Sequence, residues 1–243
     1  MLVFGDGRTV GTIGGGCYEN DAFWKAREAL THRKPQLVKY ELTDDFAQET
    51  GLICGGQMEV YIEPIEPSPE LFVIGAGHVG YHLAQLAQTC GFKLHVVDDR
   101  EKFANRERFP EADEVVTEDI PAWLERTRLP AHAYVVIVTR GHTNDLEALR
   151  ALAPRDLRYL GLIGSRAKVA RIYDALREEG VPAERLARVH APIGLEIGAV
   201  TPQEIAVSIL AELIAIRHGR LKEPGQGIPS LRWPGAVATP VGR

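Results

Sequence analysis

The sequence contains only three cysteines among its 243 residues, namely Cys17, Cys54 and Cys90. Three thiols cannot form a framework of paired disulfides and no CxxC spacing indicates a zinc site, so we expect all three to be free. Cys90 follows an apolar helix and is expected to be a small buried residue. The sequence also lacks an apolar run of the roughly 20 residues that a membrane span requires, and it lacks the pattern of a secretory signal. These absences favour a cytoplasmic protein.

Clusters of basic residues are also missing. No run of Lys and Arg occurs, and the formal net charge is −5. Because phosphate backbones bind to basic surfaces, nucleic acid is not an expected partner. Apolar residues make up 45% and charged residues 25% of the chain, which is typical of a globular protein.

A proline-rich stretch, PIEPSPE at residues 64–70, divides the chain. We therefore predict an N-terminal domain over residues 1–66, a second domain over residues 70–219, and a tail rich in Pro and Gly over residues 220–243. The predicted fold class is α/β, with a Rossmann-like parallel sheet in the second domain and a smaller α+β domain in front of it.

Two junctions of glycine and cysteine mark the N-terminal domain. Residues 2–13 predict a β-hairpin, and the segment TIGGGC then leads to Cys17, directly before a helix predicted over residues 18–31. A thiol at a helix N-terminus meets unpaired N–H groups and the positive end of the dipole, which favour its thiolate. Cys54 precedes two glycines at the entrance of a strand predicted over residues 58–62. These junctions indicate either tight turns with filler cysteines or a pocket where backbone amides and thiols approach a bulky ligand.

The second domain begins with a nucleotide-binding pattern. An apolar strand over residues 71–74 runs into GAGHVG, a helix follows over residues 81–89, and a second strand over residues 93–97 ends at Asp98. The pattern has the order and spacing of a Rossmann fold, with a strand, a glycine motif, a helix and a second strand that ends at an acidic residue. It therefore predicts that fold.

Each residue of the glycine motif has an expected task. Gly75 provides the turn, Gly77 allows a phosphate to approach the backbone, and Gly80 allows close helix packing. Asp98 is expected to accept a hydrogen bond from a ribose hydroxyl. The second acid after it would repel a 2′-phosphate, so NAD or another nucleotide without that group is favoured. His78 points either to solvent or to the neighbouring domain.

Further strands are predicted over residues 134–139 and 159–164, followed by helices over residues 146–152 and 169–179. Carboxyl ends of parallel strands meet at one edge, so the residues after these strands should join the glycine motif around one crevice. These residues are Arg140, His142, Ser165, Arg166 and Lys168. The positive groups among them suit an anion. His142 is expected either to cap its helix or hydrogen-bond a loop, or else to contact a ligand or transfer a proton.

The last predicted helix carries clear start and stop signals. Thr201 as N-cap, Pro202 at the first helical position and Glu204 three residues after the cap form a capping box. An apolar stripe then continues until Gly219. This helix is interpreted as part of the scaffold of the domain.

Seven segments carry a resemblance to a known family. They are GTIGGGCYEN, CGGQMEVYIEPI, VIGAGHVG, VVDDR, VTRGHTNDLEALRAL, YLGLIGSRAKV and HAPIGLEIGAVTPQEIAVSILAE. Over roughly residues 4–219 the sequence resembles the XdhC/CoxI family of xanthine dehydrogenase accessory proteins. Members of that family have some tens of residues before the glycine and cysteine motif, so the first domain here is expected to be either truncated or reduced.

The resemblance implies an accessory factor that binds molybdenum cofactor, protects its sulfurated form and delivers it to a molybdenum hydroxylase. The implied partners are the hydroxylase apo-enzyme, a cysteine desulfurase and a second copy of the chain in a homodimer. Under this hypothesis Cys17 and Cys54 face the cofactor across a cleft from the strand ends of the Rossmann domain.

Two other functions stay open. An NAD-dependent oxidoreductase would use the Rossmann crevice, with His142 as the candidate acid or base, but the first 65 residues are few for a substrate domain. A nucleotide-sensing regulatory module would use the same crevice for binding alone. Neither gives Cys17 or Cys54 a task, so a non-catalytic cofactor chaperone is the preferred interpretation.

Overall fold

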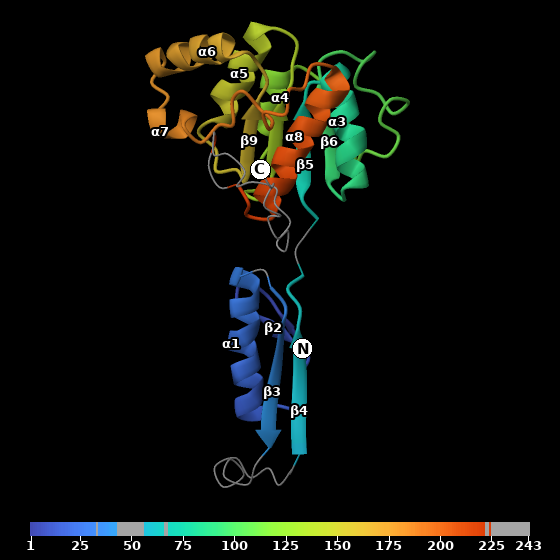
Figure 1. Cartoon of the computed structure of the whole chain (residues 1–243), viewed down its shortest axis with the longest axis vertical. Coiled ribbons are helices and arrows are strands. Elements are labelled where there is room, and N and C mark those ends of the chain that lie inside the picture. Colours follow the sequence, from blue (N-terminus) through green and yellow to red (C-terminus); the bar gives the residue numbers. More distant parts are fainter. Residues whose placement is uncertain (33, 43–55, 66–67, 222–223, 225–243) are drawn as a thin grey trace, which may run out of the picture. The chain divides into compact units, whose positions relative to one another are not determined.

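A computed structural model describes residues 1–32, 34–42, 56–65, 68–221 and 224 (Figure 1). The chain divides into two compact units, Met1–Pro67 and Ser68–Arg243. The boundary between them falls within the proline-rich stretch PIEPSPE. Within the described ranges, no helix is long and apolar enough to cross a membrane.

The described residues of the first unit form a short hairpin, one long helix and a two-stranded sheet. Strands β1 (Leu2–Val3) and β2 (Thr9–Val10) pair antiparallel, helix α1 spans Gly16–His32, and strands β3 (Gln36–Leu42) and β4 (Gly56–Ile62) form a second antiparallel pair. The predicted hairpin, helix and final strand are confirmed. Because α1 begins at Gly16, Cys17 lies inside its first turn rather than before it.

The described residues of the first unit form a small core. Helix α1 lies against β3 and β4, and along β4 the half-buried Met58 and Val60 alternate with exposed residues such as Tyr61. Among the described residues of this unit, only Ala22 and Ala29 of α1 are buried hydrophobic residues. Tyr61 is 62% exposed, so the sheet face turned away from α1 leaves apolar surface uncovered.

The second unit is built on a five-stranded parallel sheet, which confirms the predicted fold class. Its strands are β5 (Glu70–Ile74), β6 (Lys93–Asp98), β7 (Glu114–Thr117), β8 (Tyr134–Ile137) and β9 (Tyr159–Leu162). Their order across the sheet is β7-β6-β5-β8-β9, and all neighbours run parallel. From the central strand β5, the chain adds β6 and β7 on one side of the sheet. It then crosses back and adds β8 and β9 on the other side of β5.

Six helices accompany this sheet in the described part of the unit. They are α3 (His78–Thr89), α4 (Ile120–Arg126), α5 (His142–Leu152), α6 (Arg166–Glu178), α7 (Ala183–Leu186) and α8 (Pro202–Arg217). Leu71 and Val73 of β5 face the apolar cluster that includes α3 and α8, whereas Phe72 and Ile74 face the cluster that includes α4, α5 and α6 (Figure 1). Burial on both faces explains why the strands are continuous apolar runs in the sequence.

Some elements were predicted incompletely. The starts of α3, α5 and α6 lie three or four residues before their predicted positions, so His78, His142 and Arg166 are each the first helical residue. Strand β7 and helices α4 and α7 were not predicted from the sequence. The capping box of α8 is confirmed, because Thr201 accepts from the Glu204 N–H and Glu204 accepts from the Thr201 N–H.

The third cysteine lies at the end of an apolar helix, as expected. Cys90 is the C-cap residue of α3 and packs against the apolar cluster shared with α8. It is half-buried rather than fully buried. Its carbonyl oxygen accepts a hydrogen bond from Arg217 at 3.1 Å, which joins the end of α3 to the end of α8.

Candidate functional site

The loops after β5 and β8 meet where the strand order reverses, at the carboxyl edge of the sheet. Gly75 follows β5 with a φ of +112°, and a Cβ atom on it would lie 2.5 Å from the carbonyl oxygen of Val138. A Cβ atom on Gly80 would lie 2.0 Å from the carbonyl oxygen of Gly75. Both positions therefore require glycine, Gly75 for the turn beside β8 and Gly80 for the close approach of α3.

The backbone at Gly77 is open. Gly77 is the N-cap residue of α3, no side chain caps it, and a Cβ atom built on it would meet nothing within 4 Å. First-turn N–H groups of a helix can donate to a phosphate, and the dipole favours negative charge there. This part of the site therefore fits the phosphate of a nucleotide.

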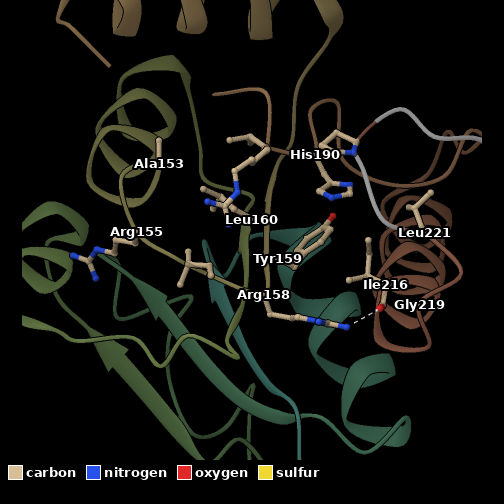
Figure 2. Close-up of a pocket in the computed structure, with 13 residues that line it drawn as sticks. Ala153, Arg155, Arg158, Tyr159, Leu160, His190, Ile216, Gly219 and Leu221 are labelled. Atoms are coloured by element: carbon tan, nitrogen blue, oxygen red, sulfur yellow. Dashed lines mark hydrogen bonds between the residues drawn. The ribbon is translucent and has the colours of Figure 1, made fainter. Parts of the chain in front are cut away.

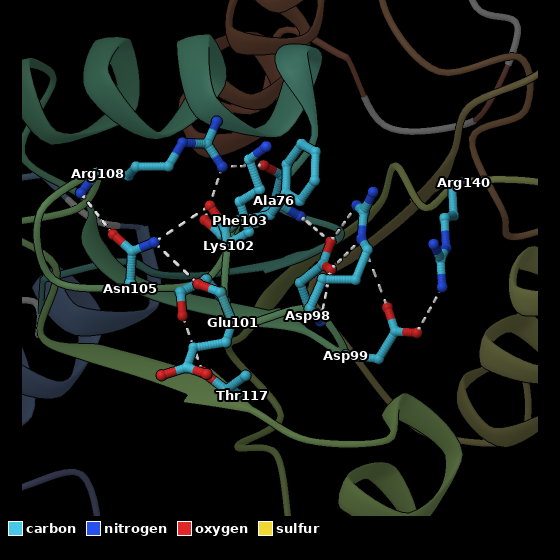
Figure 3. Close-up of polar contacts among 12 residues, drawn as sticks. Ala76, Asp98, Asp99, Glu101, Lys102, Phe103, Asn105, Arg108, Thr117 and Arg140 are labelled. Carbon is cyan, nitrogen blue, oxygen red and sulfur yellow. Dashed lines mark hydrogen bonds and ion pairs between the residues drawn. The ribbon is translucent and has the colours of Figure 1, made fainter.

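The Asp98 carboxylate forms a hydrogen bond with the backbone of the glycine loop. Asp98 is the last residue of β6 and is only 2% exposed, and its carboxylate accepts from the Ala76 N–H at 2.7 Å and from the Arg100 guanidinium at 2.7 and 2.9 Å (Figure 3). Burial acts to raise the pKa of Asp98, but the hydrogen bonds from Arg100 and Ala76 outweigh it and the pKa is lowered. A ribose hydroxyl could reach this carboxylate only after Arg100 moves, so the ribose contact stays a prediction.

A second ion pair lies across the same edge of the sheet. Arg140, after β8, donates to Asp99, after β6, at 2.9 Å, and the Arg140 side chain is 59% exposed. Arg100 lies 3.7 Å from the other oxygen of Asp99. An ion pair thus joins the two loops that flank the glycine loop (Figure 3). Asp99 is more exposed than Asp98.

Two arginines missed by the sequence analysis attach the segment after β6 to the glycine loop. Arg108 donates to the carbonyl oxygens of Ala76 at 2.8 Å and Phe103 at 2.7 Å (Figure 3). The Arg100 guanidinium stacks 3.8 Å from the ring centroid of Phe103. The available signal was the position of Arg100 directly after the acidic pair, since guanidinium groups commonly pair with nearby carboxylates.

Two imidazoles lie at the starts of helices on this edge. His78 is the first residue of α3 and His142 the first residue of α5, and both are exposed. No side chain caps α5, whose N-cap residue is Gly141 with a φ of +86°. His142 therefore does not act as a cap.

The predicted anion-binding residues after β9 have different surroundings. Lys168 forms an ion pair with Asp145, which is fully buried and also accepts from Thr139 at 2.5 Å. Ser165 caps α6 by accepting from the Lys168 N–H at 3.2 Å. Arg166, 85% exposed and 3.9 Å from a glutamate, is the member of this group whose charge faces solvent.

Cys17 lies on the first unit, where it is exposed in the first turn of α1. Gly14, Gly15 and Gly16 before it all have positive φ angles. The carboxylate of Glu19 accepts from the Thr12 hydroxyl and from two backbone N–H groups of this loop, and the Thr12 contact and these bonds lower its pKa. Glu19, which the sequence analysis did not identify, therefore shapes the loop that presents Cys17. Cys54 lies outside the described residues.

Comparison with known families covers both units. The XdhC Rossmann domain profile matches residues 71–213, more than half of the chain, and the profile of the XdhC and CoxI family matches residues 1–41. The chain belongs to the XdhC and CoxI family. The first match contains the glycine loop and the Asp98 network, and the second contains Cys17.

Relatives of this XdhC-family chain extend the comparison. It is 38% identical over 250 residues to the protein YqeB of Escherichia coli strain K12, a match that covers 99% of this chain and 46% of YqeB. It is 34% identical over 158 residues to a probable xanthine dehydrogenase subunit of Bacillus subtilis strain 168, which covers 65% of this chain and 46% of that protein. The XdhC-family chain thus spans about half the length of these curated relatives.

One solved structure is similar in fold. The crystal structure of a xanthine dehydrogenase from Bacillus halodurans matches this XdhC-family chain with a TM-score of 0.56 and 25% sequence identity. The match covers 89% of this chain and 85% of that one, so the similarity includes residues from both units.

Proposed function

We propose that the protein is an accessory factor for a molybdenum hydroxylase of the xanthine dehydrogenase type. The observation that carries this proposal is the family match over both units, supported by a relative named as a probable xanthine dehydrogenase subunit. The proposed partner is the apo-enzyme of that hydroxylase. A cysteine desulfurase and a second copy of the chain are the further partners that this role would involve.

Within this role, the proposed cargo is molybdenum cofactor, which the protein would bind and help to sulfurate and insert. This cargo offers a phosphate, a flat pterin, dithiolene sulfurs and a soft metal centre. Cys17 supports the proposal, because its exposed thiol suits a soft metal. The three glycines before it have no side chains, so a flat ligand can approach the backbone there. Cys54 is proposed as a second thiol on the same ligand.

The Rossmann crevice is proposed to bind the phosphate of the cargo or of a nucleotide such as NAD. The open backbone at Gly77 and the uncapped start of α3 support this assignment. Arg140 and Arg166 add exposed positive charge at the same edge. In this proposal the protein supplies binding and orientation, and the residues of the crevice are not assigned a catalytic step.

The experiment that tests the proposal measures cargo on the protein directly. The full chain is incubated with molybdenum cofactor without oxygen and separated by gel filtration, and molybdenum is measured in the protein peak. We expect the metal to elute with the wild-type protein, to fall on the order of tenfold in Cys17→Ser, and to persist in Cys90→Ser. The half-buried Cys90 provides the matched control thiol.

The two possible failures have different meanings. Wild-type protein without molybdenum would contradict the cargo role itself. Equal molybdenum on the wild type and on Cys17→Ser would remove the thiol of Cys17 from the site while leaving the cargo role in place.

A further inference from the structure

A cavity lies in the second unit at the amino edge of the sheet, which is opposite the edge of the glycine loop. It has a volume of about 400 Å³ and is bounded by the start of β9, residues 188–190 and the C-terminal end of α8 (Figure 2). This volume falls within the range of small-molecule sites. Tyr159 and His190 form its inner wall, and Ile216 lies on the α8 side.

Positive charge surrounds this amino-edge cavity. Its described lining residues include Arg155, Arg158 and Arg188, and none of them carries a carboxylate. The Arg155 guanidinium is held by backbone carbonyl oxygens, and Arg188 lies 3.2 Å from the exposed Asp156. Arg158 makes one long hydrogen bond to the carbonyl oxygen of Ile216, at 3.4 Å, and no ion pair within the described part of the chain. Its guanidinium therefore keeps most of its donors for another group.

The inner wall contains buried polar groups that Glu212 holds in place. His190 is 6% exposed, and its Nδ1 contacts the buried carboxylate of Glu212, whose other oxygen accepts from the Gly194 N–H. This leaves Nε2 as the ring nitrogen for a ligand. The Tyr159 side chain is 2% exposed, its hydroxyl lies within reach of the Glu212 carboxylate, and its ring centroid lies 4.6 Å from that of His190.

The Tyr159 hydroxyl therefore shares the Glu212 carboxylate with His190. Burial and the nearby charge of Glu212 raise the pKa of Tyr159 well above its usual range, so the hydroxyl keeps its proton. The remaining lining is apolar, including Leu157, Val189 and Leu221. The cavity thus combines arginine side chains at its rim, the polar side chains of Tyr159 and His190 at its inner wall, and aliphatic side chains along its sides.

We propose that the amino-edge cavity binds a small organic anion, a carboxylate or phosphate ester with an apolar body. The anionic group pairs with Arg158 and Arg188, and the apolar body lies against the aliphatic sides near His190. This site is separate from the proposed cargo site, because the first residues of β9 and the glycine loop lie at opposite edges of the sheet.

Calorimetric titration of the full chain tests this proposal with three probes, phenyl phosphate, benzoate and benzyl alcohol. We expect the two anions to bind one per chain at millimolar concentration or below and the neutral alcohol to bind far more weakly. The Arg158→Gln variant should weaken anion binding on the order of tenfold, because one charge-assisted contact is lost. The His190 imidazole signal in NMR spectra should shift with either anion. The stronger of the two anions identifies whether a carboxylate or a phosphate is preferred.

Two control variants separate this site from other sites. Arg171→Gln removes an exposed arginine of α6, and Gly77→Ala adds a methyl group at the phosphate position of the glycine loop, where the structure has room for it. Both should keep wild-type affinity for the anions. The proposal is overturned if benzyl alcohol binds as tightly as benzoate, if neither anion binds, or if Gly77→Ala abolishes binding while Arg158→Gln does not.

Discussion

Asp98 joins three parts of the second unit through one carboxylate. It terminates β6, accepts from the glycine loop at Ala76, and holds Arg100 at the start of the following segment. A carboxyl whose pKa is lowered on folding stabilises the native state at pH values above its unfolded pKa of about 4, and this contribution is lost as the pH falls through the lower folded pKa. For Asp98 the direction of the shift is downward.

The Asp98→Asn variant is therefore predicted to be less stable than the wild type at pH 7, by roughly 2–3 kcal/mol. The difference should begin to narrow as the pH falls below about 4, where the carboxyl of the unfolded chain gains its proton, and should vanish only below the lower folded pKa. Urea unfolding at pH 7 and near pH 3 measures both values. Asp174→Asn on the exposed face of α6 is the control and should change little. A gap that stays constant with pH would contradict this account.

At the same scale, the sequence predicted backbone requirements better than side-chain partners. The requirement for glycine at Gly75 and Gly80 follows from local geometry that a short motif encodes. The partners of Asp98 and Lys168 depend on where distant segments return in the fold. Lys168 was predicted to bind an anion, but Asp145 from another helix lies beside it, which no spacing along the chain indicates.

Helix α8 shows both the success and the limit of periodicity at the scale of elements. The apolar stripe and capping box predicted its position correctly. However, the polar residues Ser208 and Glu212 are also buried, because the segment before α8 returns across it. Ser208 donates to the carbonyl oxygen of Leu195 at 2.6 Å, and Glu212 contacts both His190 and the Gly194 N–H. Polar residues on a helix predict a solvent face only when no loop covers them.

Glu212 and Ser208 should therefore contribute unequally to stability. The buried Glu212 carboxylate has two hydrogen-bond partners, and Glu212→Gln removes its charge. We expect this variant to lose roughly 2–3 kcal/mol in the free energy of unfolding. Ser208→Ala removes one neutral hydrogen bond and should cost about 1 kcal/mol. Urea denaturation of both variants measures the difference. Equal losses would indicate that the two side chains only fill space between α8 and the preceding segment.

At the scale of the whole molecule, the two units differ in how much apolar surface they bury. The sequence predicted both the connection and the Rossmann-like unit, since proline content and strand periodicity are local signals. It predicted a strand over residues 58–62 in the first unit, and the structure shows the apolar residues Met58 and Val60 of this strand only half-buried. How much of a face is covered depends on what packs against it, which periodicity does not report.

This difference predicts that the second unit folds on its own and that the first unit does not. Apart from Ala22 and Ala29, all buried hydrophobic residues described in the chain belong to the second unit. Because burial of apolar surface is the main stabilising term, residues 68–243 expressed alone should unfold cooperatively, with a midpoint within a few degrees of the main transition of the full chain. Residues 1–67 alone should show no cooperative transition, because so small a core does not offset the loss of chain entropy. Circular dichroism during thermal unfolding of the three chains measures this. A cooperative transition in residues 1–67 would show that the first unit has a sufficient core of its own.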